Sequence, residues 1–387
     1  MRALLPFVAT AALVATAACS AAEVHAEPPT TTRTIASATP AVTPSSASAS
    51  AVGAPSATTG PTTTATPDPA VLTMAFGGDV HFEDYLQPLA RDPGGLAELQ
   101  TTLGAADLSM VNLETAITER GTRIGKEFHF RAPASALETV AGAGVDVVTM
   151  ANNHGVDFGP VGLKDTLAAK RASPIAVVGI GADADEALAP ATLEAKGLKV
   201  AVFGASQVYE MTLASYSADL DSGGIASASP LTMLRTAVVR AAKAHDLVVV
   251  YLHWGFDYQS CPDGQSVSTA QALAGAGADI IVGGHSHRVN GAGWLGRAYV
   301  DYGLGNFVWW RSREPDARTG VLTLSVDVAA AKGTRTERSV VRDARWTAML
   351  VGTDGIPRVP SRSDARRLHR LWEQARSCAG LAAEPKQ

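Results

Sequence analysis

The chain has 387 residues, of which 46% are hydrophobic and 18% are charged, so it can form a sizeable apolar core. Its 32 basic and 37 acidic side chains leave a net charge of −5, which provides no basic field for nucleic acid. Three cysteines are too few for a disulfide-rich scaffold. We therefore expect a globular protein with no nucleic-acid partner.

The first residues have the order of a secretory signal peptide. Arg2 is followed by an uncharged apolar run that reaches Cys19 and is shorter than a membrane-spanning helix. The small residues before Cys19 resemble a bacterial lipobox, although Thr16 stands where leucine is usual. We predict a lipoprotein-type signal peptide over residues 1–19, lipidation of Cys19 and an extracytoplasmic, membrane-anchored protein. The alternative is ordinary signal-peptidase cleavage and secretion.

Residues 20–70 consist almost entirely of Ala, Ser, Thr, Pro, Val and Gly, and they include no aromatic residue. Such a segment buries too little apolar surface to offset the entropy of chain ordering. We therefore predict a disordered tether between the membrane and a folded domain that begins at residue 71.

From residue 71 onward, short aliphatic runs alternate with helical patterns. We expect strands over residues 72–77, 108–113, 145–150, 199–205, 247–253, 280–283, 298–302 and 321–326. We expect helices over residues 162–171, 231–245 and 269–276. Several strands are continuously apolar, which indicates sheets covered on both faces. The pattern predicts an α/β domain over residues 71–350, with helices over packed sheets.

The remaining chain is less informative. Residues 332–345 alternate basic and small side chains, which is typical of a solvated hairpin. Residues 361–379 have helical spacing with arginines on the polar face, so we predict that residues 351–387 form a helical tail.

Polar residues gather where the predicted strands end. The set comprises Asp79, His81, Asn112, Glu114, Asn152, Asn153, His154, His253, His285 and His287. Ligand sites of open α/β sheets lie beyond the carboxyl ends of strands, so we expect these side chains to converge. Imidazole, carboxylate and amide ligands without thiolate suit Zn, Mn or Fe. The set indicates two catalytic divalent ions, although any one of these histidines alone would be read as a structural residue, and Asn112 as a turn residue.

The ordered motifs GGDVH, NLE, ANNH, LHWG, GGHSH and GLGNF resemble the CapA family of capsule or poly-γ-glutamate synthesis proteins. This family is a branch of the calcineurin-like metallophosphoesterase superfamily, and the resemblance covers residues 71–310. It implies a sandwich of two packed mixed β-sheets flanked by helices. Glu114 stands where the superfamily has a bridging aspartate, as in CapA proteins, and Asn152 stands where it has glycine.

The resemblance also implies roles for individual residues. It places Asp79, His81, Glu114 and His287 on one divalent ion, and Glu114, Asn153, His253 and His285 on the other. His154 is then a catalytic acid that binds no metal. The implied chemistry is two-metal hydrolysis of a phosphoester, in which His154 stabilises or protonates the leaving oxygen.

Other residues have two readings each. Positive charge for an anionic substrate could come from Lys126, His129 and Arg131, and from Arg288 beside the last histidine pair. The alternative is a structural role, in which residues 128–131 form a packed hairpin. Asn306 is either a turn residue or a substrate contact. Trp254, Trp309 and Trp310 are expected in the core rather than in a cleft. Cys261 and Cys378 are either a disulfide that fastens the tail or two free thiols.

Three functions follow from these patterns. The first is a cell-surface hydrolase of capsule or poly-γ-glutamate metabolism, which we expect to be an enzyme with a phosphoester substrate. The second is an accessory protein that binds or exports an anionic envelope polymer, with polymer synthase or export proteins as partners. The third is an extracellular nucleotidase or phosphatase, for which the sequence lacks an evident second nucleoside-binding domain.

Overall fold

The structure is a computed structural model, and it describes residues 68–336 and 338–385. The predicted signal peptide, the lipidation site Cys19 and residues 20–67 of the predicted tether lie outside the described residues. Within the described ranges, none of the helices has the length and apolar character that crossing a bilayer requires.

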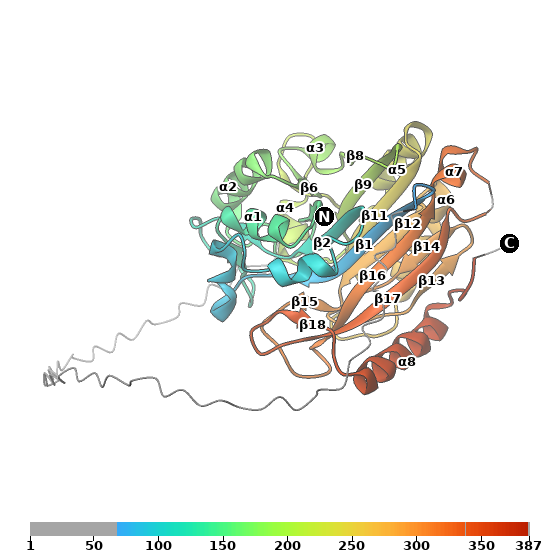
Figure 1. The fold of residues 1–387 in the computed structure, drawn as a ribbon. Helices are drawn as coiled ribbons and strands as arrows, with labels where there is room; N and C mark the ends of the chain where they lie inside the picture. The colour runs from blue at the N-terminus through green and yellow to red at the C-terminus, as the bar shows by residue number, and fades with distance from the viewer. Residues whose placement is uncertain (1–67, 337, 386–387) are drawn as a thin grey trace, which may run out of the picture. The chain divides into compact units, whose positions relative to one another are not determined.

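The larger sheet is mixed and has the strand order β18-β17-β16-β1-β2-β5-β6, with β15 paired to β1 (Figure 1). Its strands are β1 (Val71–Val80), β2 (Leu108–Leu113), β5 (Val147–Thr149), β6 (Ala176–Val178), β15 (Asn306–Val308), β16 (Arg318–Asp327), β17 (Val341–Val351) and β18 (Pro357–Arg358). Strands β1, β2, β5 and β6 run parallel, so their carboxyl ends meet at one edge.

The smaller sheet has the order β13-β14-β12-β11-β9-β8. Its strands are β8 (Ala191–Ala195), β9 (Leu198–Ser206), β11 (Leu247–Trp254), β12 (Ile280–His285), β13 (Ala292–Leu295) and β14 (Ala298–Asp301). Strands β9, β11, β12 and β14 are parallel. Two small ladders pair β3 (Ala116–Ile117) with β4 (Arg131–Ala132) and β7 (Ile180–Gly181) with β10 (Gly224–Ile225).

Helices flank the two sheets. They are α1 (Ser135–Gly142), α2 (Gly159–Ala172), α3 (Ala184–Ala187), α4 (Met211–Tyr216), α5 (Thr232–Ala244), α6 (Gly264–Ala276), α7 (Val328–Lys332) and α8 (Arg362–Ala379), with short 3-10 turns at Asp84–Leu86, Leu89–Arg91 and Ala97–Thr101. The apolar faces of α1 and α2 pack on the larger sheet, and those of α5 and α6 pack on the smaller one. The predicted sandwich of two mixed sheets flanked by helices is confirmed.

A third core lies between the sheets and explains their continuous apolar character. In β11, Val249 and Tyr251 face this core, whereas Val248 and Val250 face α5 and α6. The Tyr251 hydroxyl donates across the interface to the Gly77 carbonyl at 3.0 Å. Because successive side chains of a strand point to opposite faces, a strand with both faces covered must be apolar throughout.

The C-terminal part differs from its prediction. Residues 341–345 belong to β17, which pairs antiparallel with β16, and are therefore part of the larger sheet rather than of a solvated hairpin over residues 332–345. The helix over residues 361–379 is confirmed as α8, which packs on β13 and β17 (Figure 1). A disulfide joins Cys261, in the loop after β11, to Cys378 of α8. It closes a loop of 117 residues and fastens α8 to the smaller sheet.

The sheet interior holds a carboxyl group whose ionisation should weaken the fold. Asp301 is fully buried, its Oδ1 accepts from the Gly303 N–H at 2.9 Å, and its Oδ2 has no hydrogen-bond partner among the described residues. Burial raises the pKa of Asp301 to about 7. A raised carboxyl pKa favours the neutral form in the folded state, so this group costs stability as the pH rises from about 4 to about 7.

We therefore expect Asp301→Asn to remove this pH dependence. As the pH rises from 4 to 8, the wild type should lose about 4 kcal/mol of unfolding free energy that the variant keeps. The difference, variant minus wild type, therefore grows by that amount. Urea denaturation of both proteins in chelator, at several pH values, measures the difference. A difference that does not change with pH would show that Asp301 does not titrate in the fold.

Candidate metal centre

The carboxyl ends of strands from both sheets bring three predicted ligands together. Asp79 lies near the end of β1, Glu114 directly follows β2, and His253 lies near the end of β11. Ligand atoms of these three residues all lie within 4.8 Å of one another, and all three residues are buried. The strand-end pattern in the sequence thus predicted a real convergence of a carboxylate pair and an imidazole.

The close approach of the two sheets depends on a glycine. A Cβ atom at Gly284 would lie 2.5 Å from Asp79 Oδ1, which is closer than van der Waals contact allows. The next residue, His285, donates its backbone N–H to Asp79 Oδ2 at 3.1 Å. His285 and His287 have φ angles of 87° and 52°, a region that costs non-glycine residues energy. This turn holds the His285 backbone N–H and the His287 imidazole against the Asp79 carboxylate at the expense of backbone strain.

We expect Gly284→Ala to displace Asp79 and weaken metal binding at least tenfold, because misplaced ligands lose coordination energy. Gly264→Ala is the matched control, since no atom lies within 4 Å of a Cβ added there. Isothermal titration calorimetry, with Mn²⁺ added to each metal-free protein, gives the dissociation constants. Equal affinities in the two variants would contradict the assigned role of Gly284.

Several buried ligand atoms have no hydrogen-bond partner within residues 68–336 and 338–385. They are both carboxylate oxygens of Glu114, Nδ1 of His285, Nδ1 of His287 and Nε2 of His81. Burial and the nearby Asp79 carboxylate raise the pKa of Glu114 well above its usual value. Because unpartnered buried polar atoms are costly, this concentration at one place fits a site built to hold cations.

The buried side chain of Asn112 contacts two of the predicted metal ligands. Its Nδ2 donates to Asp79 Oδ1 at 2.8 Å and lies 3.2 Å from His253 Nδ1. Its Oδ1 accepts from Asn152 Nδ2 at 2.9 Å. Asn112 lies within β2 and not in a turn, so the predicted turn role is wrong. One buried amide therefore sets the spacing between a strand of each sheet and the loop after β5.

The predicted acid His154 forms a dyad that was not predicted. His154 Nδ1 lies 2.6 Å from Asp157 Oδ2, and its Nε2 lies 3.8 Å from Glu114 Oε1. Burial raises the pKa of Asp157 to about 6, while its partners Lys126, at 3.1 Å, and the Phe130 N–H favour the carboxylate. With Asp157 accepting from Nδ1–H, Nε2 of His154 faces the centre as the reactive nitrogen.

The residues predicted for the second ion lie together. His253 Nε2 is 2.9 Å from Asn153 Oδ1 and 3.7 Å from Glu114 Oε1. The ring of His285 lies 4.8 Å from that of His253, and burial lowers the pKa of both imidazoles, which keeps them neutral. Asn153 Nδ2 donates to Glu210 Oε2 at 3.0 Å, so its Oδ1 is directed inward.

The residues predicted for the first ion are less uniform. His287 Nδ1 lies 3.4 Å from Asp79 Oδ2. His81 accepts the Glu83 backbone N–H at Nδ1, at 3.0 Å, so Nε2 carries the proton of the neutral ring. Its ring stacks on Phe130, at 4.5 Å between centroids. Metal ligation through Nε2 of His81 would require loss of that proton.

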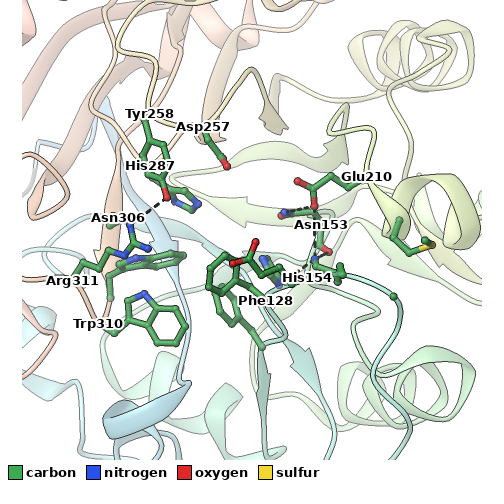
Figure 2. Close-up of a pocket in the computed structure, with 16 residues that line it drawn as sticks. Phe128, Asn153, His154, Glu210, Asp257, Tyr258, His287, Asn306, Trp310 and Arg311 are labelled. Carbon is green, nitrogen blue, oxygen red and sulfur yellow. Dashed lines mark hydrogen bonds and ion pairs between the residues drawn. The ribbon is translucent and has the colours of Figure 1, made fainter. Parts of the chain in front are cut away.

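A cavity of about 420 Å³ lies above these residues. Figure 2 shows Asn153 on one side of it and His287, Trp310 and Arg311 on the other. Trp309 and Trp310 line this cavity and so correct the expectation of a purely core role, whereas Trp254 is in the core as expected.

The residues predicted to contact substrate fall into two groups. Lys126 and Asn306 line the cavity, and Asn306 Oδ1 is buried without a partner in the described structure. His129, Arg131 and Arg288 are not among the lining residues. His129 Nε2 bonds to the Ile124 carbonyl, Arg131 stacks on Phe158, and Arg288 pairs with Asp316. Residues 128–131 form no hairpin, because β4 pairs parallel with β3.

Sequence reasoning missed Asn112 as a connecting residue and also missed Asp157, Glu210, Asp257 and Arg311. Asp157 follows His154 by one turn, a spacing that could have suggested the dyad. Glu210, Asp257 and Arg311 lie in loops and line the cavity. Loop residues of this kind carry no periodic signal, so only the fold identifies them.

The family follows from a direct comparison. The model of the family described as bacterial capsule synthesis protein PGA_cap matches residues 73–309, which include every metal-centre residue described above. The chain belongs to this family. The resemblance inferred from the sequence motifs is therefore confirmed.

Two relatives within the family have been curated under capsule names. The PGA biosynthesis protein CapA of Bacillus subtilis is 28% identical over 255 residues, covering 63% of this chain and 66% of that protein. The capsule biosynthesis protein CapA of Bacillus anthracis is 32% identical over 261 residues, covering 63% of this chain and 62% of that protein. The matches thus span less than two thirds of either relative.

Among solved structures, a phosphatase from Mycoplasma pneumoniae is similar, with a TM-score of 0.46 and 17% identity. The similarity covers 72% of this chain and 94% of the phosphatase.

Proposed function

We propose that this chain is a metal-dependent hydrolase of the cell envelope that acts on a phosphoester during synthesis of a capsular polymer such as poly-γ-glutamate. The observation that carries the proposal is the buried group of Asp79, Glu114 and His253, whose surroundings hold unpartnered ligand atoms. The predicted signal peptide would direct export, and the predicted lipid on Cys19 would hold the protein at the outer face of the cytoplasmic membrane.

Two divalent ions fit the residues present. Asp79 and His287, with His81, would hold the first ion, and Asn153, His253 and His285 would hold the second, with Glu114 between them. The mixture of imidazole, carboxylate and amide suits Mn, Fe or Zn. When bound, such ions supply Lewis-acid polarisation of a phosphoryl oxygen.

The chain's own residues supply positioning and a proton. Asp157 would accept from Nδ1–H and so stabilise the imidazolium form of His154, whose Nε2–H is the proton that passes to the leaving oxygen. Lys126 donates to the Asn153 carbonyl at 2.5 Å and pairs with Asp157, which ties the acid and a metal ligand to one cation. The walls formed by Trp309, Trp310 and Phe130 would exclude water from the centre.

A second candidate is a non-catalytic accessory protein that binds or exports the polymer together with a synthase. The names of the two Bacillus relatives, a PGA biosynthesis protein and a capsule biosynthesis protein, link them to polymer synthesis, which is compatible with this role. In this case the bound ions would hold carboxylates of the polymer rather than a reacting phosphoester.

Elemental analysis of the purified protein, combined with hydrolysis of an aryl phosphate, separates the candidates. Two metal ions per chain with turnover support the hydrolase. Two ions without turnover, together with binding of oligo-γ-glutamate, support the accessory role. A protein that retains no divalent metal after exposure to Mn²⁺, Fe²⁺ or Zn²⁺ would overturn both.

A further inference from the structure

Exposed aromatic side chains gather around the opening of the cavity at the metal centre. Within residues 68–336 and 338–385, the large aromatic side chains that are strongly exposed are Tyr85, Phe128, Tyr209, Phe256 and Tyr258, at 44%, 46%, 79%, 66% and 48%. Phe128 and Tyr258 line the cavity above the metal centre (Figure 2). Tyr209 and Phe256 line an adjoining hollow, and the Tyr85 hydroxyl bonds to the carbonyl of Trp310 in the cavity wall.

The two hollows adjoin each other, because Glu210 and Asp257 line both of them. Figure 2 shows Asp257 beside Tyr258 and Glu210 beside Asn153. Exposed apolar side chains scattered singly are ordinary, but a contiguous group at the mouth of a cavity indicates a binding surface. We call Phe128, Tyr209, Phe256 and Tyr258 the aromatic rim.

The charges on these walls are unsuited to a polyanion. The cations that line the cavity are Lys126 and Arg311, and both are already paired, with Asp157 at 3.1 Å and with Asp316 at 3.3 Å. The carboxylates Glu127, Glu210 and Asp257 also line it. Two paired cations beside three carboxylates offer little attraction to a second anionic group of a ligand.

The same walls suit a neutral ring that carries hydroxyl groups. The apolar C–H faces of a sugar ring pack on aromatic rings, and its hydroxyls donate to carboxylates such as Glu210 and Asp257. We propose that the aromatic rim is a sugar-binding subsite, so that the substrate of the adjoining centre is a phosphoester of a sugar or glycan. The placement of the phosphate at the metal centre rests on the proposed function, whereas sugar binding by the aromatic rim does not.

Binding of neutral sugars tests the rim without metal or turnover. Maltotetraose and chitotetraose are titrated by calorimetry into the full protein after treatment with chelator, with tetra-γ-glutamate as the anionic comparison. We expect at least one tetrasaccharide to bind at least tenfold more tightly than tetra-γ-glutamate. Phe256→Ala and Phe128→Ala should each weaken sugar binding about tenfold. Leu220→Ala, which removes an even more exposed apolar side chain that lines neither hollow, should have no effect.

Absence of binding by both tetrasaccharides, or tighter binding of tetra-γ-glutamate, would overturn the sugar assignment. Equal losses in the rim variants and in Leu220→Ala would overturn the location. Adenosine is tested in the same way, and tighter binding of this nucleoside than of either tetrasaccharide would assign the rim to a nucleobase and also overturn the proposal. Because the metal centre is empty in this experiment, these outcomes are independent of whether the protein hydrolyses phosphoesters.

Discussion

Glu114→Gln should abolish metal binding and, in the same protein, stabilise the metal-free fold. The carboxylate of Glu114 is the group that lies between Asp79 and His253, and both of its oxygens are buried without a partner in the described residues. Glutamine keeps the shape but cannot supply two anionic oxygens to cations. It also removes a buried charge beside Asp79, which should stabilise the metal-free protein by roughly 1–3 kcal/mol at neutral pH or above.

The result is read from metal content and thermal unfolding together. In the wild type, Mn²⁺ should raise the Tm, because ligands that bind only the folded state stabilise it. The variant should begin a few degrees higher in chelator and show no shift with Mn²⁺. Glu119→Gln, which changes an exposed carboxylate paired with Arg91, should behave like the wild type. A variant that retains metal, or that is less stable without it, would contradict the role given to Glu114.

His154→Ala should separate catalysis from metal binding. His154 Nε2 lies 3.8 Å from Glu114 and its Nδ1 is held by Asp157, an arrangement that suits proton donation rather than ligation. We expect turnover of an aryl phosphate to fall about 100-fold to 10,000-fold, with the metal content unchanged. Asp157→Asn should have a smaller effect in the same direction, because the ring loses its orienting carboxylate.

A suitable comparison is His245→Ala, which removes a histidine that bonds to Thr192 and precedes β11, at the opposite end of that strand from His253. Metal content by elemental analysis and initial rates are measured on the same samples. Loss of metal in His154→Ala would make His154 a ligand, and unchanged turnover would remove it from the mechanism.

The sequence predicted most of the sandwich because its strands are covered on both faces. The run at residues 108–113 was predicted with the bounds of β2, and residues 231–245 differ from α5 by one residue at each end. In contrast, β17 alternates buried and exposed residues and carries many charges, so its sequence is similar to that of a solvated hairpin. The three residues of β15 become a strand only through pairing with β1, which no local pattern reveals.

The site was predictable where topology sets it. Parallel strands place Asp79, Glu114 and His253 at common edges, so their meeting followed from strand ends alone. The local hydrogen bonds did not follow, because the acceptor role of His81 Nδ1 depends on the turn at Glu83. Asp257 reaches within 3.5 Å of His285 Nε2 only through tertiary folding. The first contact depends on the backbone conformation of a turn and the second on tertiary folding, so residue spacing encodes neither.

Anomalous diffraction from crystals grown with Mn²⁺ would test the metal centre most directly. We expect two manganese peaks on either side of the Glu114 carboxylate, one next to Asp79 and the other next to His253. Crystals in which no peak lies within coordination distance of these three side chains, although the Mn²⁺ concentration is high, would contradict the metal centre and the hydrolase proposed from it.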